Sequence, residues 1–414
     1  MSTLSEKLRS LGVQIGARDL PAPIRRDTLP SLDAVLSGRS IETPFGETYL
    51  VEKSYPVGHQ HGNAPLLLTA PLNVLANWAG NESISGLPPE AFAFLDTETT
   101  GLSGGSGTYA FLIGVGRFEN GEFRLAQFFM RDPLEEPGQL MALEQFLAPC
   151  QALVTYNGKA FDLPLLVARY VSQGWMVPFS DYAHIDLLHL ARRLWHGRLP
   201  SRSLGNVEAS ILGTMRTEDD VPGWMIPQMY FDYLRSGDAQ PLRSVFYHNA
   251  MDVVSLASLL NYSAALLADP LTEGAEHGVD LFDLAHLFED MGDIDSATRL
   301  YINGIKHPDV IENRMPEEEY IRALERLALI YKRDANFTSA ASLWMQATRH
   351  RHLESHIELA KFYEHHARDF VQALRWTRAA IELLDSPQIS NYPRSLWLAE
   401  LEHRQERLLS KISR

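Results

Sequence analysis

The chain has very little cysteine, no long apolar run and a shortage of positive charge. Its one cysteine among 414 residues, Cys150, excludes an intrachain disulfide and is typical of a reducing compartment, so we expect a cytoplasmic protein. No apolar stretch reaches the length that crosses a bilayer, about 18 residues, so we expect no membrane partner. The opening residues, MSTLSEKLRSLG, carry charges without an apolar core, which predicts no secretory signal.

The charge balance limits the kinds of partner. A formal net charge of −15 disfavours a large nonspecific nucleic-acid surface. It leaves room for a nucleic-acid enzyme whose bound metal ions supply positive charge locally. A hydrophobic content of 45% with 21% charged residues is typical of a globular protein, and the length predicts two or three domains.

The patterning predicts three regions. Residues 1–88 are irregular, rich in Pro and Gly, with one candidate β-hairpin at 43–58, and a polar break at 80–90 follows. Residues 89–269 predict an α/β domain, in which a three-strand antiparallel meander passes into alternating helices and strands around a mixed sheet. Its strand candidates are 92–100, 108–118, 122–130 and 152–158, its helix candidates 138–149, 163–174, 185–197, 201–213, 226–237 and 241–269. Asn120-Gly121 between two apolar runs is the strongest hairpin signal.

Residues 270–414 predict an all-α region of helical hairpins. Three segments repeat Leu-Ala, an aromatic residue, a polar turn and a further alanine. Small residues at such fixed offsets let paired helices approach closely, as in tetratricopeptide repeats, and such an array offers a surface for a protein partner. The alanine pairs are Ala285 with Ala297, Ala328 with Ala340, and Ala360 with Ala373.

Four acidic residues stand where the predicted topology brings them together. Asp96 and Glu98 lie two residues apart in one strand and so point to the same side, Asp162 follows the fourth strand, and Asp252 lies in the long apolar helix. Carboxylate oxygens suit Mg²⁺ or Mn²⁺, and two such ions can stabilise both oxygens of a phosphodiester displacement. The alternatives are turn acids for the first two and a helix N-cap for Asp162. Asp186 is predicted to be a structural residue at a helix start.

Two residues compete for the role of general base. His248 lies four residues before Asp252 on the same helix face, whereas Tyr247 lies about 100° around the helix. Because imidazole accepts a proton near neutral pH and a phenolate forms only in strong base, we favour His248.

Three motifs carry a family resemblance: FLDTETTGL, YNGKAFDLP and HNAMDVVSL. They resemble the exonuclease motifs of the DEDD superfamily, and above all the bacterial YprB-type ribonuclease H-like branch. The resemblance implies an RNase H-like fold, two ions held by the four acids, and removal of nucleotides from a 3′ end. It further implies that some residues contact the substrate: Thr99, Gly101, Leu102 and Asn157. The superfamily places Tyr four or His five residues before the last Asp, and this chain exchanges the two.

The sequence therefore predicts a Mg²⁺- or Mn²⁺-dependent 3′→5′ exonuclease acting on single-stranded DNA or RNA. The alternatives are a weakly active nuclease-fold scaffold and a structure-specific endonuclease. A cluster of arginines between 192 and 202 is interpreted either as a solvated helix end or as a strip that contacts phosphates. Its members are Arg192, Arg193, Arg198 and Arg202.

Overall fold

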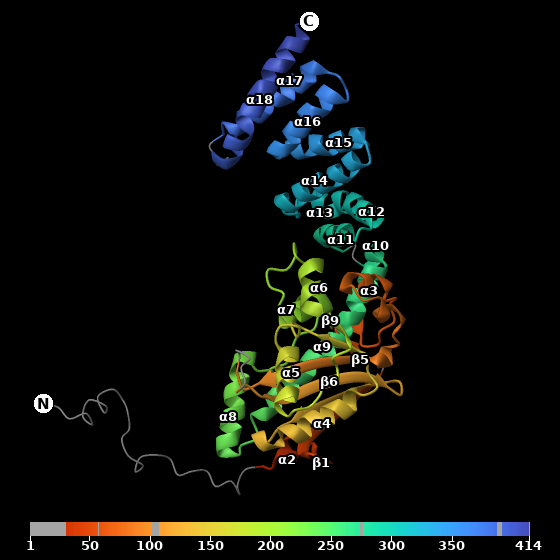
Figure 1. Ribbon diagram of the computed structural model, residues 1–414, viewed down its shortest axis with the longest axis vertical. Helices are drawn as coiled ribbons and strands as arrows, with labels where there is room; N and C mark the ends of the chain where they lie inside the picture. The colour runs from red at the N-terminus through yellow and green to blue at the C-terminus, as the bar shows by residue number, and fades with distance from the viewer. Residues whose placement is uncertain (1–29, 57, 102–106, 274–275, 387–390, 414) are drawn as a thin grey trace, which may run out of the picture.

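A seven-stranded mixed sheet forms the centre of the computed structural model, which describes residues 30–56, 58–101, 107–273, 276–386 and 391–413 (Figure 1). The order of its strands is β1-β2-β7-β6-β5-β8-β9. The strands are β1 (Arg39–Thr43), β2 (Gly46–Pro56), β5 (Phe92–Thr99), β6 (Ala110–Glu119), β7 (Glu122–Phe129), β8 (Ala152–Thr155) and β9 (Ala183–Asp186). A two-stranded ribbon, β3 (Gln60–His61) with β4 (Ala64–Pro65), lies apart. The predicted mixed α/β sheet is confirmed.

The predicted hairpin at Asn120-Gly121 forms, whereas the hairpin predicted at 43–58 is shifted toward the N-terminus, because residues 46–56 are one strand, β2, that pairs with β1 before it. β6 and β7 meet at Asn120 and Gly121, whose φ angles of 52° and 78° match the turn that suits twisted antiparallel strands. β1 and β2 meet where Thr43 pairs with Gly46, and β2 then pairs with β7. The sheet thus continues into the region before residue 88, although the domain boundary itself stays a prediction.

Helices cover the two faces of the sheet. In β5, Phe92 and Phe94 point toward α9 (Leu242–Ala268), whereas Ala93 and Leu95 pack with α4 (Glu136–Leu147) and α5 (Asp162–Ser172). This alternation is the two-residue period of a strand buried on both faces. It sends Asp96 and Glu98 toward the α9 side and Thr97 toward the α5 side.

The sequence analysis missed the short strands β3 and β4 and, closer to the site, β9. The chain was predicted to be helical from residue 185, but β9 runs to Asp186 and the helix α6 begins only at Leu187. Parallel pairing with β8, which joins Val154 to Ile185, overrides the helical pattern of the apolar run. The other helices of this part are α2 (Leu32–Leu36), α3 (Asn73–Ala79), α6 (Leu187–Leu194), α7 (Leu204–Val207), a π turn (Glu208–Leu212) and α8 (Ile226–Ser236).

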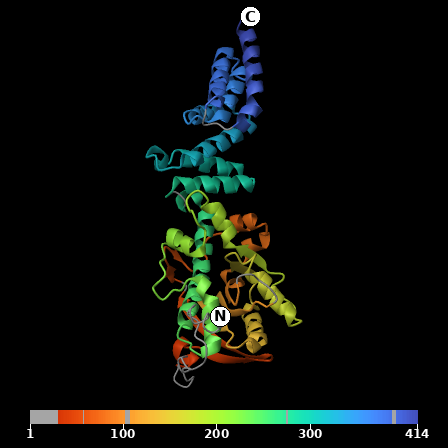
Figure 2. The same cartoon turned by 90° about the vertical axis from the view of Figure 1, so that its left-hand side faces the viewer.

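The C-terminal part consists of helices packed as successive pairs that stack away from the sheet (Figures 1 and 2). They are α10 (Pro270–Glu273), α11 (Gly278–Asp290), α12 (Ile294–Ile305), α13 (Pro308–Ile311), α14 (Glu317–Arg333), α15 (Phe337–Thr348), α16 (Leu353–His365), α17 (Phe370–Leu384) and α18 (Asn391–Ile412). All six alanines of the predicted repeats are fully buried. The second helix of each pair begins with a side-chain cap, supplied in turn by Asp293, Asn336 and Asp369.

One helix in the described part of the chain, α9, is long and apolar enough to cross a membrane, yet 78% of its most apolar window is buried inside the protein. Its neighbours are the sheet and the helices around it. α9 is therefore the core helix of the α/β domain, and it delivers His248 and Asp252 to the end of β5.

Candidate active site

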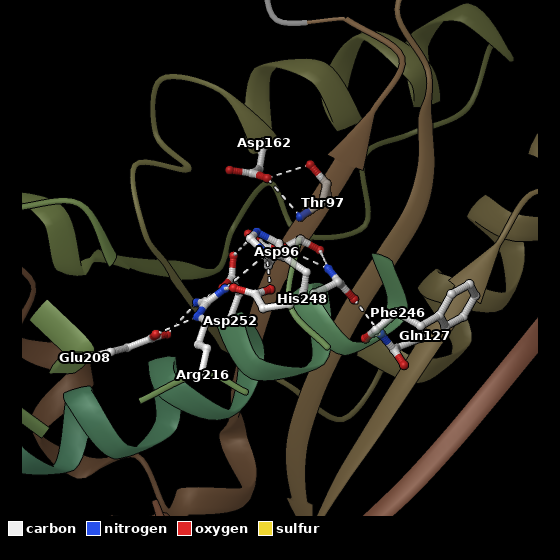
Figure 3. Close-up of polar contacts among 11 residues, drawn as sticks. Asp96, Thr97, Gln127, Asp162, Glu208, Arg216, Phe246, His248 and Asp252 are labelled. Atoms are coloured by element: carbon white, nitrogen blue, oxygen red, sulfur yellow. Dashed lines mark hydrogen bonds and ion pairs between the residues drawn. The ribbon is translucent and has the colours of Figure 1, made fainter. Parts of the chain in front are cut away.

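Asp96 is fixed by an amide pair that joins two neighbouring elements. Asn249, fully buried in α9, donates from Nδ2 to Asp96 Oδ2 at 2.8 Å, and Gln127 in β7 donates to Asn249 Oδ1 at 2.9 Å (Figure 3). Gly114 in β6 makes room for this arrangement, because a Cβ there would lie 2.2 Å from Asn249 Oδ1. Residues of β6, β7 and α9 thus set the orientation of the Asp96 carboxylate at the end of β5.

Asp162 lies at the first position of α5 and points toward β5. Its Oδ1 accepts hydrogen bonds from Thr97 N at 3.1 Å and Thr97 Oγ1 at 2.5 Å (Figure 3). The helix N-cap is Phe161, so the interpretation of Asp162 as the capping residue is wrong. Its carboxylate instead joins the start of α5 to the strand that carries Asp96 and Glu98.

An arginine that the sequence analysis missed holds Asp252. Arg216, in the loop before α8, makes an ion pair with Asp252 Oδ1 and binds Glu208 with two hydrogen bonds, of 2.8 Å from Nε and 2.7 Å from Nη2 (Figure 3). The Glu208 side chain is 1% exposed, and the guanidinium compensates its buried charge. A cation at Asp252 therefore competes with Arg216 for the same carboxylate.

The four carboxylates influence one another's pKa values. Burial raises the pKa of Asp96 well above its usual range, and the charges of Asp252 and Asp162 raise it further. The pKa of Glu98 is raised by burial and then by the charges of Asp96, Asp252 and Asp162. Burial also raises the pKa of Asp252, although the charge of Arg216 opposes that shift. The structure thus brings the four predicted acids into one cluster of mutually repelling groups.

The donor set of this cluster fits a divalent ion in its chemistry. Oxygen ligands alone are what Mg²⁺ and Mn²⁺ prefer, and a bound cation relieves the repulsion among ionised carboxylates. Among the residues the structure describes, no three His, Cys, Asp or Glu side chains already surround one point as metal ligands. One of the four carboxylates, that of Asp252, is paired with Arg216.

His248 faces the cluster, whereas Tyr247 does not. His248 Nε2 lies 3.7 Å from Asp252 Oδ2, and Nδ1 lies 2.8 Å from Asp220 Oδ1. Nδ1 also lies 3.1 Å from Arg216 Nη1, but two donors cannot bond to each other, so the shorter contact with the carboxylate assigns the proton to Nδ1. Nε2 is then free to accept a proton. The Tyr247 hydroxyl instead accepts from Thr217 N at 3.2 Å.

The residues predicted to contact substrate lie in two places. Thr99 ends β5 and donates to Gly101 O at 2.9 Å, while Leu102 lies outside the described residues. Asn157 follows β8 in a left-handed conformation, with φ 66°, and its N–H donates to Asp186 Oδ1 at 2.7 Å.

The structural role predicted for Asp186 is confirmed. Its fully buried carboxylate caps α6 through Leu188 N at 3.1 Å, and it also accepts from Lys159 N at 3.0 Å. Asp186 therefore shapes the loop that leads from β8 to Asp162.

Comparison with known proteins places this site in a family. The family model RNase_H_2, described as RNase_H superfamily, matches residues 93–264, a span that includes all four acids and His248. The uncharacterized protein YprB of Bacillus subtilis (strain 168) is 33% identical over 335 residues, which are 78% of this chain and 78% of that protein. The chain belongs to the RNase H-like family that includes YprB. A nuclease-type hydrolase domain therefore occupies the sheet region, and RNase H-like nucleases generally use divalent metal ions.

A solved structure shows a weaker likeness to this RNase H-like chain. The family B DNA polymerase from the hyperthermophilic archaeon Pyrobaculum calidifontis is 18% identical, with a TM-score of 0.32. The match covers 50% of this chain and 30% of the polymerase chain. A likeness this low carries no argument about activity.

The raised pKa of Asp162 predicts how the stability of this RNase H-like protein depends on pH without metal. Burial raises that pKa to about 6, so the folded state holds the proton more tightly than the unfolded state. The free energy of unfolding should therefore fall as pH rises from about 4 to above 6, by on the order of 2 kcal/mol from this group. In Asp162→Asn, which keeps an oxygen to accept from Thr97, this part of the fall should disappear.

Chemical denaturation in the presence of a chelator, at about pH 4 and about pH 7, measures the difference between the two proteins. Asp181→Asn, at an exposed acid in the loop before β9, is the matched control and should follow the wild type. If the free energies of unfolding of Asp162→Asn and the wild type differed by the same amount at the two pH values, the raised pKa of Asp162 would be contradicted.

Proposed function

We propose that the chain is a Mg²⁺- or Mn²⁺-dependent 3′→5′ exonuclease that hydrolyses phosphodiester bonds of single-stranded DNA or RNA in the cytoplasm. The observation that carries this proposal is the cluster of half-buried, mutually repelling carboxylates at the end of β5. Repulsion among like charges destabilises the folded protein, so such a cluster indicates a function. Strongly shifted pKa values concentrate at functional sites. The ligands would be Asp96, Glu98, Asp162 and Asp252.

The metal supplies charge that stabilises the attacking and leaving oxygens of the phosphodiester displacement. The chain supplies position. Asn249 and Gln127 orient Asp96, and Thr97 orients Asp162, so two ligands on different elements keep their places. Carboxylates held by such hydrogen bonds need little rearrangement when the cation is present.

His248 is the general base in this proposal. Asp220 accepts from Nδ1 at 2.8 Å and thereby keeps the free lone pair on Nε2, the nitrogen that faces the acids. A water molecule between Nε2 and a substrate phosphate would give its proton to Nε2 as its oxygen attacks phosphorus, while the bond from phosphorus to the 3′-oxygen of the preceding nucleotide breaks and that oxygen takes a proton from solvent. Asp220 then stabilises the imidazolium that forms, as the group that orients a catalytic base does elsewhere.

In this proposal the enzyme acts at the 3′ end of the nucleic-acid strand. Thr99, Gly101 and Asn157 are the residues proposed to contact the terminal nucleotide. All three lie beside the acids in the chain or at the neighbouring strand end. The helical pairs after residue 270 would offer a surface for a protein partner.

The first experiment tests the carboxylates. Asp96→Asn keeps the shape of the side chain and the bond to Asn249 possible, but removes a charge that the ion needs, so Mn²⁺-dependent hydrolysis of a 5′-labelled single strand should fall by at least about 10³-fold. Asp181→Asn should keep full activity. A linear and a circular single strand are compared, since only an enzyme that needs an end leaves the circle intact.

Full hydrolysis by Asp96→Asn would place the reaction elsewhere. Cleavage of the circle would favour the endonuclease alternative, and no hydrolysis by the wild type of either strand would favour the scaffold alternative.

A second pair of variants tests the base. His248→Gln should lower the rate by about 10²- to 10⁴-fold, because general-base catalysis typically contributes that much, with little change in Mn²⁺ affinity measured by calorimetry. Tyr247→Phe should keep most of the activity, because its hydroxyl bonds only to Thr217 N among the described residues. If the damage were in the reverse order, the role would pass to Tyr247, and if neither variant were slower, neither side chain would be the base.

A further inference from the structure

A cationic hollow lies where the nuclease-type domain meets the helical pairs. It has a volume of about 210 Å³ and is formed by α6 and the residues just after it on one side, and by α11, α12 and α14 on the other. Its charged and titratable lining residues are Arg192, Arg193, His196, Asp283, His286, Glu319, Arg322 and Arg326. We call it the junction hollow.

Positive charge dominates the junction hollow, in a chain whose net charge is −15. Four arginines face two acids, and one of those acids, Asp283, is only partly ionised near neutral pH because burial raises its pKa to about 8. A concentration of arginine against the overall charge of the molecule indicates a local anion site.

The arginines differ in how far protein carboxylates already neutralise them. Arg322 contacts Glu319 at 2.8 Å, and Arg193 pairs with Asp290. Arg326 makes a longer contact of 3.5 Å with Glu289 and keeps 41% of its side chain exposed. Arg192 is exposed, and no ion pair to it is found among the described residues. Arg192 and Arg326 are therefore the cations with most capacity left for a ligand.

Arg192 also connects the junction hollow to the proposed active site. It lines a second hollow, of about 520 Å³, together with Tyr156, Asn157 and Arg202. Phe94 of β5 pairs in parallel with Val154 of β8, so Tyr156 lies at the level of Asp96 along the sheet. Arg192 thus lines both the junction hollow and a hollow beside the end of β8, the strand next to the one that carries Asp96.

We propose that the junction hollow binds a backbone phosphate of the single strand whose 3′ end is being hydrolysed, several nucleotides before that end. This rests on the proposed function. Arginine forks match phosphate oxygens in geometry, and contacts to phosphate position a strand without reading its sequence. The helical region would then hold the substrate as well as any protein partner, and long strands would bind more tightly than short ones.

The test compares strand lengths in the full-length protein. Binding of 5′-labelled single strands of about 4 and about 20 nucleotides is followed by fluorescence anisotropy with a chelator present, so that the strands stay intact. The variant is Arg192→Gln with Arg326→Gln. The control is Arg349→Gln with Arg378→Gln, the same change of charge at exposed positions of the later helical pairs.

The double variant should bind the longer strand about 10-fold more weakly at about 0.1 M salt, with the slope of log affinity against log salt concentration reduced by about 0.7, the contribution of one phosphate contact on a single strand. Its affinity for the shorter strand and for a mononucleotide should stay as in the wild type, and the control should match the wild type throughout. Arg192→Gln alone, at an exposed position, should show a smaller loss of the same kind.

Equal losses for both lengths, or none, would overturn this inference. Weakened binding of the mononucleotide would identify the hollow as a site for free nucleotides instead. Hydrolysis by the same preparations separates the two proposals. If the wild type cleaves strands but the variants bind strands of every length as tightly as the wild type, the exonuclease proposal stands and the phosphate site in the junction hollow is ruled out. A wild type that neither binds nor cleaves single strands would remove both.

Discussion

The crowding of half-buried carboxylates at the end of β5 is the constraint on which the rest of the site depends. Each ionised acid raises the cost of ionising the next, so the fold must compensate them one by one. Asp96 receives the amide of Asn249, and Asp162 receives two hydrogen bonds from Thr97. Asp252 receives a guanidinium, which a fully buried glutamate holds in place. These contacts come from a strand, two helices and a loop, so the cluster ties together elements that are far apart in the sequence.

The ion pair of Asp252 gives the cluster two states. Without metal, Arg216 neutralises Asp252; burial lowers the pKa of Arg216, but its contacts with Glu208 and Asp252 raise that pKa overall. With a cation present, Asp252 has a second positive partner, and two positive groups on one carboxylate repel each other. Glu208 binds Nε and Nη2 of Arg216, and Nη1 lies 3.6 Å from Asp220 Oδ2, so the arginine keeps acidic partners when Asp252 is taken by a cation. The same arginine thus neutralises Asp252 in the metal-free protein.

Much of the fold and of the carboxylate cluster could be predicted from the sequence, because the apolar periodicity is strong in the strands and helices that carry the acids. The alternation of β5 predicted that Asp96 and Glu98 share a face, and the Asn120-Gly121 turn predicted the β6–β7 hairpin. Arg216 was not predictable, because its loop has no periodicity and its partners are assembled only by the tertiary fold. Asn249 carried a usable signal, as a polar residue within an apolar helix, since such groups are rarely buried without a partner. β9 was missed because four residues that pass directly into a helix give too short a pattern to separate from it.

Anomalous diffraction from a crystal soaked in Mn²⁺ tests whether the carboxylates hold metal, because it locates the ions and the side chains together. We expect manganese among Asp96, Glu98, Asp162 and Asp252, with the carboxylate of Asp252 turned from Arg216 and the guanidinium still bound to Glu208. A crystal at saturating Mn²⁺ with no ion among these carboxylates, and with Arg216 still paired to Asp252, would contradict this expectation.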